Sequence, residues 1–296
     1  MPSRPLPHAA AHALLHLTVL VWGFTAILGR GISIPAIPLV FYRLVFVVLA
    51  MGALAAWRRI RWELTAATAR VLVVAGVFVA LHWILFYGCI KAAGVAVAVI
   101  CLSSSTFFTA CLEPLLFRRA VRPGELLVGL VVVGGVSLLV RFETRASGVG
   151  LAMGIGSALF SAAFGTINGR AVHAARAELV ALVELGTALG VTALSLLARP
   201  GDFVSPGALS MRDLALLLVL AIGCTVVPWL WSLRVLRTLS PYTVALAVAL
   251  EPIYSIVLAW AFFGRAERLG GRFYLGAGAL VGLIVANGWM KRPRGA

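Results

Sequence analysis

The sequence predicts an all-α integral membrane protein with ten transmembrane helices, and three observations lead to this fold class. The chain has 296 residues, of which 62% are hydrophobic and only 12% are charged, and its mean hydropathy is +1.05. So few charges cannot cover the surface of a soluble domain of this length. The apolar residues also come in about ten blocks, and a bilayer core about 30 Å thick needs roughly 20 residues per helix.

The expected spans follow one another with connections too short to hold a soluble domain. No small-residue cleavage site follows the first apolar run, so this run is interpreted as a retained helix rather than a signal peptide. The four cysteines lie inside apolar runs without CxxC spacing, so we expect buried thiols, no metal and no cofactor. The spans cover residues 13–29, 35–57, 71–90, 92–117, 124–140, 147–169, 179–198, 214–233, 240–264 and 273–290.

Lys and Arg residues are divided unevenly between the two sides of the predicted bundle. The side that holds both termini carries fifteen of the 25 Lys and Arg residues, and the opposite side carries nine. Positive loops favour the cytoplasm, so both termini are expected there, in a multi-pass protein of a bacterial inner-membrane type of cell membrane. The clusters form no continuous basic face, so the net charge of +15 does not indicate nucleic-acid binding.

The chain repeats itself internally. An offset of 146 residues pairs Trp83 with Trp229, and an offset of 140 pairs FTAILGR in the first span with FGTINGR in the sixth. We therefore expect two five-helix units, residues 1–143 and 144–296. Five is odd, so the second unit enters the bilayer from the opposite face. Inverted repeats of this kind alternate access around a midplane site in many secondary transporters.

Two Glu-Pro pairs, at Glu113 and Glu251, look alike but occupy different places in the repeat. In the 146-residue register Glu113 faces Ala259, whereas Glu251 faces Ser105. Glu113 lies near the cytoplasmic boundary, where it forms a cytoplasmic gate or pairs with neighbouring arginines. Glu251 lies in the middle of its span and is either a substrate-amine partner, a proton-coupling group or a structural carboxyl.

Over nearly its whole length the chain resembles the drug/metabolite transporter (DMT) superfamily, specifically its ten-helix EamA-type permeases. The resemblance rests on VWGFTAILGR in the first span, PLVFYRLVF in the second, and ALEPIYSIVLAWAFFG with AERLGGRFYLGAG in the last two. Glu267 sits where the family usually has a glutamate, whereas the matching place in the first half is Ala120. The resemblance implies a secondary transporter that works without ATP, in efflux or uptake of small metabolites, including amino acids.

Arg43 is a charge deep inside the second span. It either binds a carboxylate substrate through a bidentate contact, or neutralises Glu184 or Glu251 within the bundle. An offset of 141 places Arg43 opposite Glu184 of the seventh span, so the repeat carries opposite charges at matched places. The pattern is consistent with a binding site and with a structural ion pair.

Other polar and aromatic residues inside the spans are candidates for the substrate pathway. His82, Trp83 and Trp229 either line a cavity for flat or apolar groups or simply pack helices together, and Pro228 is expected to kink the eighth span. The hydroxyl run of the fourth span is either a polar stripe or a helix contact. The candidates for binding or pathway are Trp22, Arg43, His82, Trp83, Ser103, Ser104, Thr106, Asn168, Glu184, Trp229, Glu251 and Tyr254, with Glu113 as the gate.

These features favour a transporter in which the two halves rock around a central cavity. The carboxylate of a small zwitterion meets Arg43 or serine hydroxyls and its amine meets Glu251, while proton coupling passes through Glu251 or His82. An intramembrane enzyme and a non-transporting membrane partner protein are the alternatives, and the sequence has no HExxH motif to support an enzyme. The spacing Gly150-xxx-Gly154 predicts close helix packing or a homodimer contact.

Overall fold

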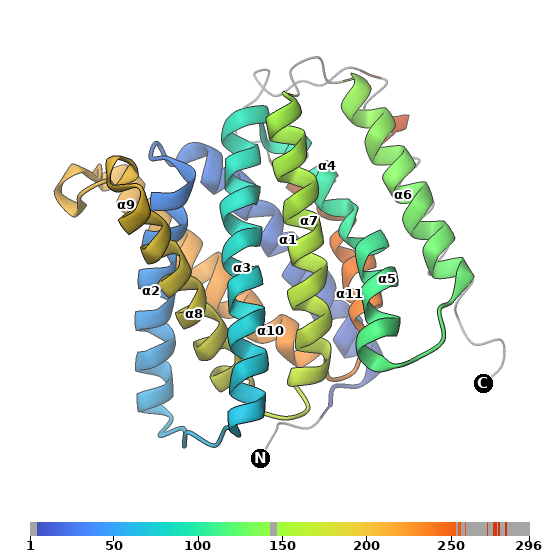
Figure 1. Cartoon of the computed structure of the whole chain (residues 1–296), viewed down its shortest axis with the longest axis horizontal. Coiled ribbons are helices and arrows are strands. Elements are labelled where there is room, and N and C mark those ends of the chain that lie inside the picture. The colour runs from blue at the N-terminus through green and yellow to red at the C-terminus, as the bar shows by residue number, and fades with distance from the viewer. Residues whose placement is uncertain are drawn as a thin grey trace.

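The computed structural model of the chain describes residues 5–142, 147–252, 254–255, 258, 271, 275–276, 278 and 282. In these parts the regular structure is helical, and the long helices run alongside one another with short connections (Figure 1). The helices are α1 (His8–Gly31), α2 (Ala36–Trp57), α3 (Ala66–Ala93), α4 (Val95–Ser103), α5 (Ser105–Phe117), α6 (Pro123–Phe142), α7 (Gly148–Ala171), α8 (Ala177–Ala198), η1 (Pro200–Asp202), η2 (Pro206–Ala208), α9 (Met211–Leu218), η3 (Val219–Val226), α10 (Val227–Val235) and α11 (Pro241–Val248).

Seven helical segments in the described part of the chain are long and apolar enough to cross a membrane. They correspond to the predicted spans one to four and six to eight. The fifth span, α6, contributes a shorter apolar stretch, Pro123–Gly135. Most of the ninth and tenth spans lies outside the described residues. The all-helical membrane class is therefore confirmed, while the count of ten spans, their inverted order and the side of the termini stay predictions.

The first helix is longer than the sequence analysis predicted. It begins at His8 instead of residue 13, directly after Pro7. The added residues HAAAH are rich in alanine, the strongest helix former, and contain no residue that would stop a helix. The helix propensity of these residues therefore extends α1 at its N-terminal end, beyond the apolar block that predicts the membrane span.

Two helix breaks occur at matched positions of the repeat. The fourth span, predicted as one helix, is divided at Ser104 into α4 and α5. Here a serine hydroxyl competes for backbone partners, and Ser103 Oγ donates to the carbonyl oxygen of Ala249 over 3.3 Å. α11 ends at Val248, because Pro252 has no N–H for the Val248 carbonyl and its ring crowds that oxygen. The two breaks, 146 residues apart, therefore touch each other.

Glycines bring the central helices close together. α3 packs side by side with α7 and α8 (Figure 1). A Cβ on Gly76 of α3 would lie 2.5 Å from the backbone oxygen of Glu184 on α8. A Cβ on Gly154 of α7 would lie 2.7 Å from Cys101 Cβ, and one on Gly150 would lie 2.6 Å from Ala93 Cβ. The predicted Gly150-xxx-Gly154 spacing thus packs helices within the chain, and the homodimer stays a prediction.

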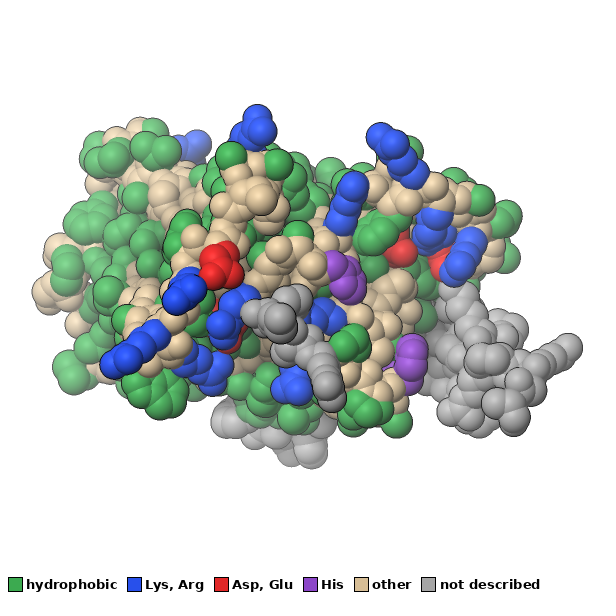
Figure 2. Space-filling view, turned by 90° about the horizontal axis from the view of Figure 1, so that it is seen from below, with side chains coloured by type: hydrophobic (Ala, Val, Ile, Leu, Met, Phe, Trp, Pro, Cys, Tyr) green, Lys and Arg blue, Asp and Glu red, His purple; other side chains and the backbone are tan. Residues whose placement is uncertain are grey.

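One end of the bundle is rich in positive side chains. Figure 2, which views the molecule from below its position in Figure 1, shows Lys and Arg gathered over this end. Arg58, after α2, pairs with Glu178 at the start of α8 over 3.2 Å. On the turn between α5 and α6, Arg119 contacts Glu125 over 2.6 Å. This basic end is the one predicted to face the cytoplasm.

Candidate functional site

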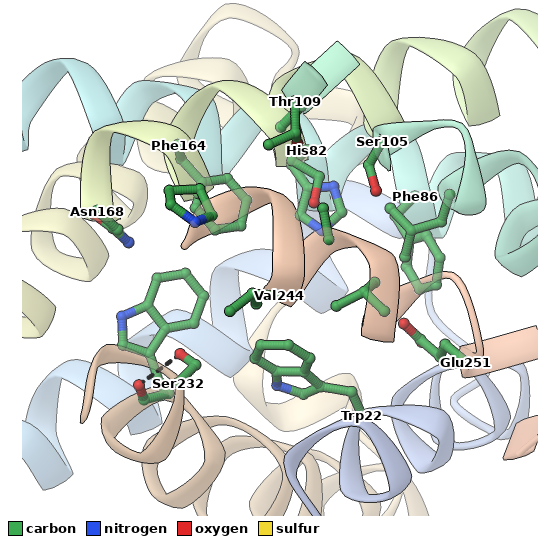
Figure 3. Close-up of a pocket in the computed structure, with 18 of the residues that line it drawn as sticks. Trp22, His82, Phe86, Ser105, Thr109, Phe164, Asn168, Ser232, Val244 and Glu251 are labelled. Atoms are coloured by element: carbon green, nitrogen blue, oxygen red, sulfur yellow. Dashed lines mark hydrogen bonds between the residues drawn. The ribbon is translucent and has the colours of Figure 1, made fainter. Parts of the chain in front are cut away.

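A cavity of about 100 Å³ lies between helices of both halves of the chain (Figure 3). Its walls come from α1, α2, α3, α4, α5, α7, α10 and α11, together with the turn after α11. A cavity of this size favours a small solute. The lining residues that carry polar or aromatic groups are Trp22, Thr25, Arg43, His82, Trp83, Phe86, Ser105, Thr109, Ser161, Phe164, Asn168, Trp229, Ser232 and Glu251.

Arg43 of α2 is a buried charge in this wall, with only 3% of its surface exposed. Its Nε donates to Thr225 Oγ1 and its Nη1 donates to the Tyr87 hydroxyl oxygen, each over 2.8 Å. The guanidinium carbon lies 3.8 Å from the ring centre of Trp83, a cation–π distance. Among the described residues Arg43 contacts neither Glu184 nor Glu251. Of the two interpretations of Arg43, the ion pair is therefore not formed among these residues, and neutral partners hold the guanidinium.

A wide helical turn places Thr225 beside Arg43. Residues Val219–Val226 form a π-helix between α9 and α10, and Thr225 Oγ1 donates to the Leu220 carbonyl oxygen, five residues earlier, over 2.6 Å. Such turns are frequent at functional sites. This π-helical segment ends two residues before Pro228, and the kink expected at the proline stays a prediction.

The aromatic residues predicted from the repeat meet in the cavity wall. Trp83 and Trp229, counterparts at the 146-residue offset, have ring centres 5.7 Å apart in an edge-to-face arrangement. Phe164 stacks on Trp229 at 5.5 Å and lies 5.5 Å from His82. The imidazole Nδ1 of His82 is within 2.9 Å of Ser157 Oγ. The wall is therefore a continuous aromatic surface that suits a flat or apolar group.

Glu251 enters the cavity where α11 has ended. The residue is 3% exposed, and its carboxyl group receives no hydrogen bond from a described residue. Ser105, which starts α5 after the other helix break, lines the same cavity. The two residues are counterparts in the 146-residue register, so both breaks present a side chain to one space (Figure 3).

The other hydroxyl candidates of the fourth span face its neighbours instead. Ser103 and Thr106 donate to the carbonyl oxygens of Ala249 and Ala245, and Ser104 Oγ is buried without a partner in the described structure. Ser103 and Thr106 thus hold α4 and α5 against the ninth span, which is the helix contact that was one of the two interpretations of the hydroxyl run. Tyr254 also lies outside the cavity lining.

Asn168 and Glu184 form a polar pair at the cavity wall. Asn168 of α7 lines the cavity, and its Nδ2 donates to Glu184 Oε2 of α8 over 3.2 Å. Glu184 is fully buried and does not itself line the cavity. Glu184 Oε1 and Asn168 Oδ1 have no hydrogen-bond partner in the described structure.

Glu113 is tied to the start of α11. Its Oε2 accepts a hydrogen bond from the Tyr242 backbone N–H over 2.8 Å, and Arg119 Nε lies 3.4 Å from Oε1. A carboxylate at a helix N-terminus satisfies an otherwise unpaired N–H and the helix dipole. Both the predicted arginine contact and a contact to the opposite half are present, whereas a gating role stays a prediction.

Comparisons with known proteins identify the family of the chain. The family described as EamA-like transporter family matches residues 10–141 and again residues 148–287. The chain belongs to the EamA-like transporter family. A solved structure described only as "Crystal structure of protein" has the same fold, with a TM-score of 0.72 at 16% identity, over 97% of this chain and 99% of that chain. No curated protein matches the chain.

Membership of the EamA-like family confirms the resemblance to the DMT superfamily. It makes the chain a multi-pass membrane transporter with a small-molecule substrate, and not an enzyme. The two successive matches indicate an internal repeat, and the gap between them contains the predicted division between residues 143 and 144.

Sequence reasoning missed Ser105 and Phe164, which line the cavity, and Thr225, which lies outside the lining and holds Arg43. Ser105 was identifiable, because the repeat pairs it with Glu251. Phe164 was contained in the FGTINGR stretch that the repeat aligns with the first span. Thr225 gave no signal, because its contact with Arg43 depends on a π-helical turn that no residue pattern announces.

Proposed function

We propose that this EamA-like protein is a secondary transporter that moves a small zwitterionic metabolite, of the amino-acid class, by alternating access. One observation carries the proposal: Arg43 and Glu251 line one cavity, and neither contacts a residue of opposite charge in the described part of the chain. A guanidinium and a carboxyl group held apart in one cavity complement a solute that bears a carboxylate and an amine.

The cavity offers a partner for each part of such a solute. The substrate carboxylate meets the guanidinium of Arg43, whose Nη2 has no hydrogen-bond acceptor among the described residues. The amine meets Glu251, with the Ser105 hydroxyl in the same cavity. The apolar part of the solute lies against Trp83, Trp229 and Phe164, whose rings contact one another.

The proposed transport cycle follows from the repeat. The units 1–143 and 144–296 form ten spans in inverted order, with both termini in the cytoplasm of a cell with a bacterial type of inner membrane. The two family matches and the arginine-rich end support this arrangement. The cavity lies where the two units meet, so rocking of one unit against the other exposes it to each side in turn.

The experiment compares ligands that lack one charge at a time. Purified protein is screened against the amino acids by thermal shift, since a ligand that binds the folded state stabilises it. The best amino acid is then compared with its N-acetyl derivative, which has no amine. We expect the wild type to prefer the free amine by about 10- to 100-fold, the range of one hydrogen bond to a charged group. Glu251→Gln is expected to lose this preference.

Glu113→Gln is the matched control for Glu251→Gln. Glu113 is also a buried glutamate followed by proline, but it contacts Tyr242 and Arg119 instead of the cavity. This variant is expected to keep the preference for the free amine. If no amino acid stabilises the protein or crosses proteoliposomes that contain it, the proposed substrate class is wrong.

A further inference from the structure

We infer that Glu184 and Asn168 form a proton-binding site next to the substrate cavity, whose protonation changes the cavity wall. The inference rests on the proposed transport function and assigns the proton to a pair other than the Glu251 and His82 considered from the sequence. It starts from two atoms of the pair, Glu184 Oε1 and Asn168 Oδ1, that are both buried and both lack a hydrogen-bond partner in the described structure.

The two unpartnered atoms are complementary once a proton is added. A carboxylic acid and a carboxamide can share two hydrogen bonds, one in each direction. Here one is formed, from Asn168 Nδ2 to Glu184 Oε2 over 3.2 Å. The other needs a hydrogen on Glu184 Oε1 to donate to Asn168 Oδ1. A carboxylate has no such hydrogen, so both acceptors stay unsatisfied. A single proton satisfies both atoms, and each unsatisfied buried acceptor otherwise has a free-energy cost.

No cation among the described residues pairs with Glu184. Glu184 is fully buried, and an ionised carboxylate in such a place is costly without a cation. The ionisable side chains on the helices packed against α8 are bound elsewhere or exposed at helix ends. They are Tyr42 and Arg43 of α2, Arg70, His82, Tyr87, Cys89 and Lys91 of α3, Arg234 of α10 and Asp202 of η1. Arg70 is exposed, Lys91 donates to the Ile32 carbonyl oxygen, and Cys89 lies beside Gly154 of α7.

The buried members of this set have hydrogen-bond partners other than Glu184. Tyr42 donates to the Val204 carbonyl oxygen, Arg43 donates to Thr225 and Tyr87, and His82 contacts Ser157. None of them forms a hydrogen bond or an ion pair with Glu184 in the described structure. The burial of the carboxyl group is therefore offset by a proton and not by a neighbouring cation.

The site communicates with the cavity through its neighbours. Asn168 and Trp229 both line the cavity, and the Trp229 indole Nε1, which has no acceptor in the described structure, lies close to Glu184. When Glu184 is protonated, Asn168 Oδ1 is occupied by the acid. When Glu184 is ionised, Asn168 Oδ1 loses this partner, so the amide group can turn towards the cavity that it lines, and the carboxylate can accept a hydrogen bond from Trp229. Binding of proton and substrate is therefore linked in both directions.

The test measures the proton directly, without a substrate. Infrared difference spectra of the purified protein are recorded between acidic and alkaline pH, and the carbonyl stretch of a protonated carboxylic acid is followed. We expect a band in the wild type that is lost in Glu184→Gln and retained in Glu113→Gln and Glu251→Gln. In Asn168→Leu the band is expected at higher frequency, because the acid has lost its hydrogen-bond acceptor.

The outcomes separate this inference from the proposed function. A wild-type spectrum without a titrating acid band, or a band that survives unchanged in Glu184→Gln, overturns the proton site even if amino acids bind. Should Glu184→Gln not fold, Asn168→Leu decides, because an unshifted band there also overturns the pair. In proteoliposomes, Glu184→Gln is expected to bind the amino acid but to lose acceleration of flux by a pH gradient.

Discussion

Arg43 on α2 and Glu184 on α8 occupy matched places in the two halves, yet the protein treats their charges differently. Arg43 faces the cavity and is held by Thr225, Tyr87 and the ring of Trp83. Glu184 is sealed behind the wall, with one hydrogen bond from Asn168. The comparison shows that two matched positions of a repeat can hold side chains with different roles. Local partners decide whether a buried group is kept charged or is neutralised by a proton.

The largest expected effect concerns the Arg43 side of the comparison. Arg43→Gln removes the charge that we assign to the substrate carboxylate, and binding of the amino acid should weaken by about 10- to 100-fold. The measurement is ligand-dependent thermal stabilisation, with the amide derivative of the same amino acid as a reference. The wild type should discriminate against the amide and Arg43→Gln should not. Arg43→Lys is not expected to restore discrimination, because one ammonium cannot reproduce the two-sided hydrogen bonding of the guanidinium.

A second effect, on stability instead of ligand binding, is expected where Gly76 of α3 packs against the backbone of Glu184 on α8. Gly76→Ala would place a Cβ 2.5 Å from the Glu184 backbone oxygen, and overpacking of this kind costs about 1–3 kcal/mol. The unfolding temperature in detergent should fall. Gly186→Ala on α8 is the matched control, because its Cβ meets nothing within 4 Å among the described residues and alanine favours a helix. If both variants have the unfolding temperature of the wild type, the close contact at Gly76 does not exist.

The smallest effect is a coupling free energy close to zero between the two charges. Arg43→Gln and Glu184→Gln, alone and together, are compared by their unfolding free energies. Because no described contact joins the residues, the two changes should add within about 0.5 kcal/mol, as independent sites do. A larger coupling free energy would indicate that Arg43 and Glu184 interact, and would contradict the separate roles assigned to them.

Much of the fold followed from the sequence because apolar blocks and repeats are properties of the residues themselves. The repeat also identified Trp83 and Trp229 as candidate cavity residues, because it maps one half onto the other. The contact between their rings was not predicted, and Ser105 was paired with Glu251 without being placed in the cavity. The split between α4 and α5 did not, since three serines are tolerated in a straight helix and break it only where a partner such as the Ala249 carbonyl is present.

The sequence left Arg43 between an ion pair and a binding site for a similar reason. Sequence shows which charges a bundle contains, but the neutral partners that hold Arg43 come from a tyrosine on α3 and a threonine in a π-helical turn. Neither residue type is exceptional in a membrane helix. Their directions are fixed by helix phase and packing, which a linear pattern does not contain.

The π-helical turn Val219–Val226 lies between α9 and α10, and it determines how this continuous helical segment responds to the loss of a residue. A π turn holds an additional residue while the helical segments before and after it keep their rotational phase. Deleting one residue there, such as the exposed Ile222, would leave Asp213 and Trp229 on their present faces. A deletion elsewhere in the helix would rotate one segment by about 100°. The hydroxyl of Thr225, inside the turn, would nevertheless leave Arg43. Loss of a single residue from this turn would thus preserve the helix but leave the guanidinium with Tyr87 and the Trp83 ring as its remaining partners.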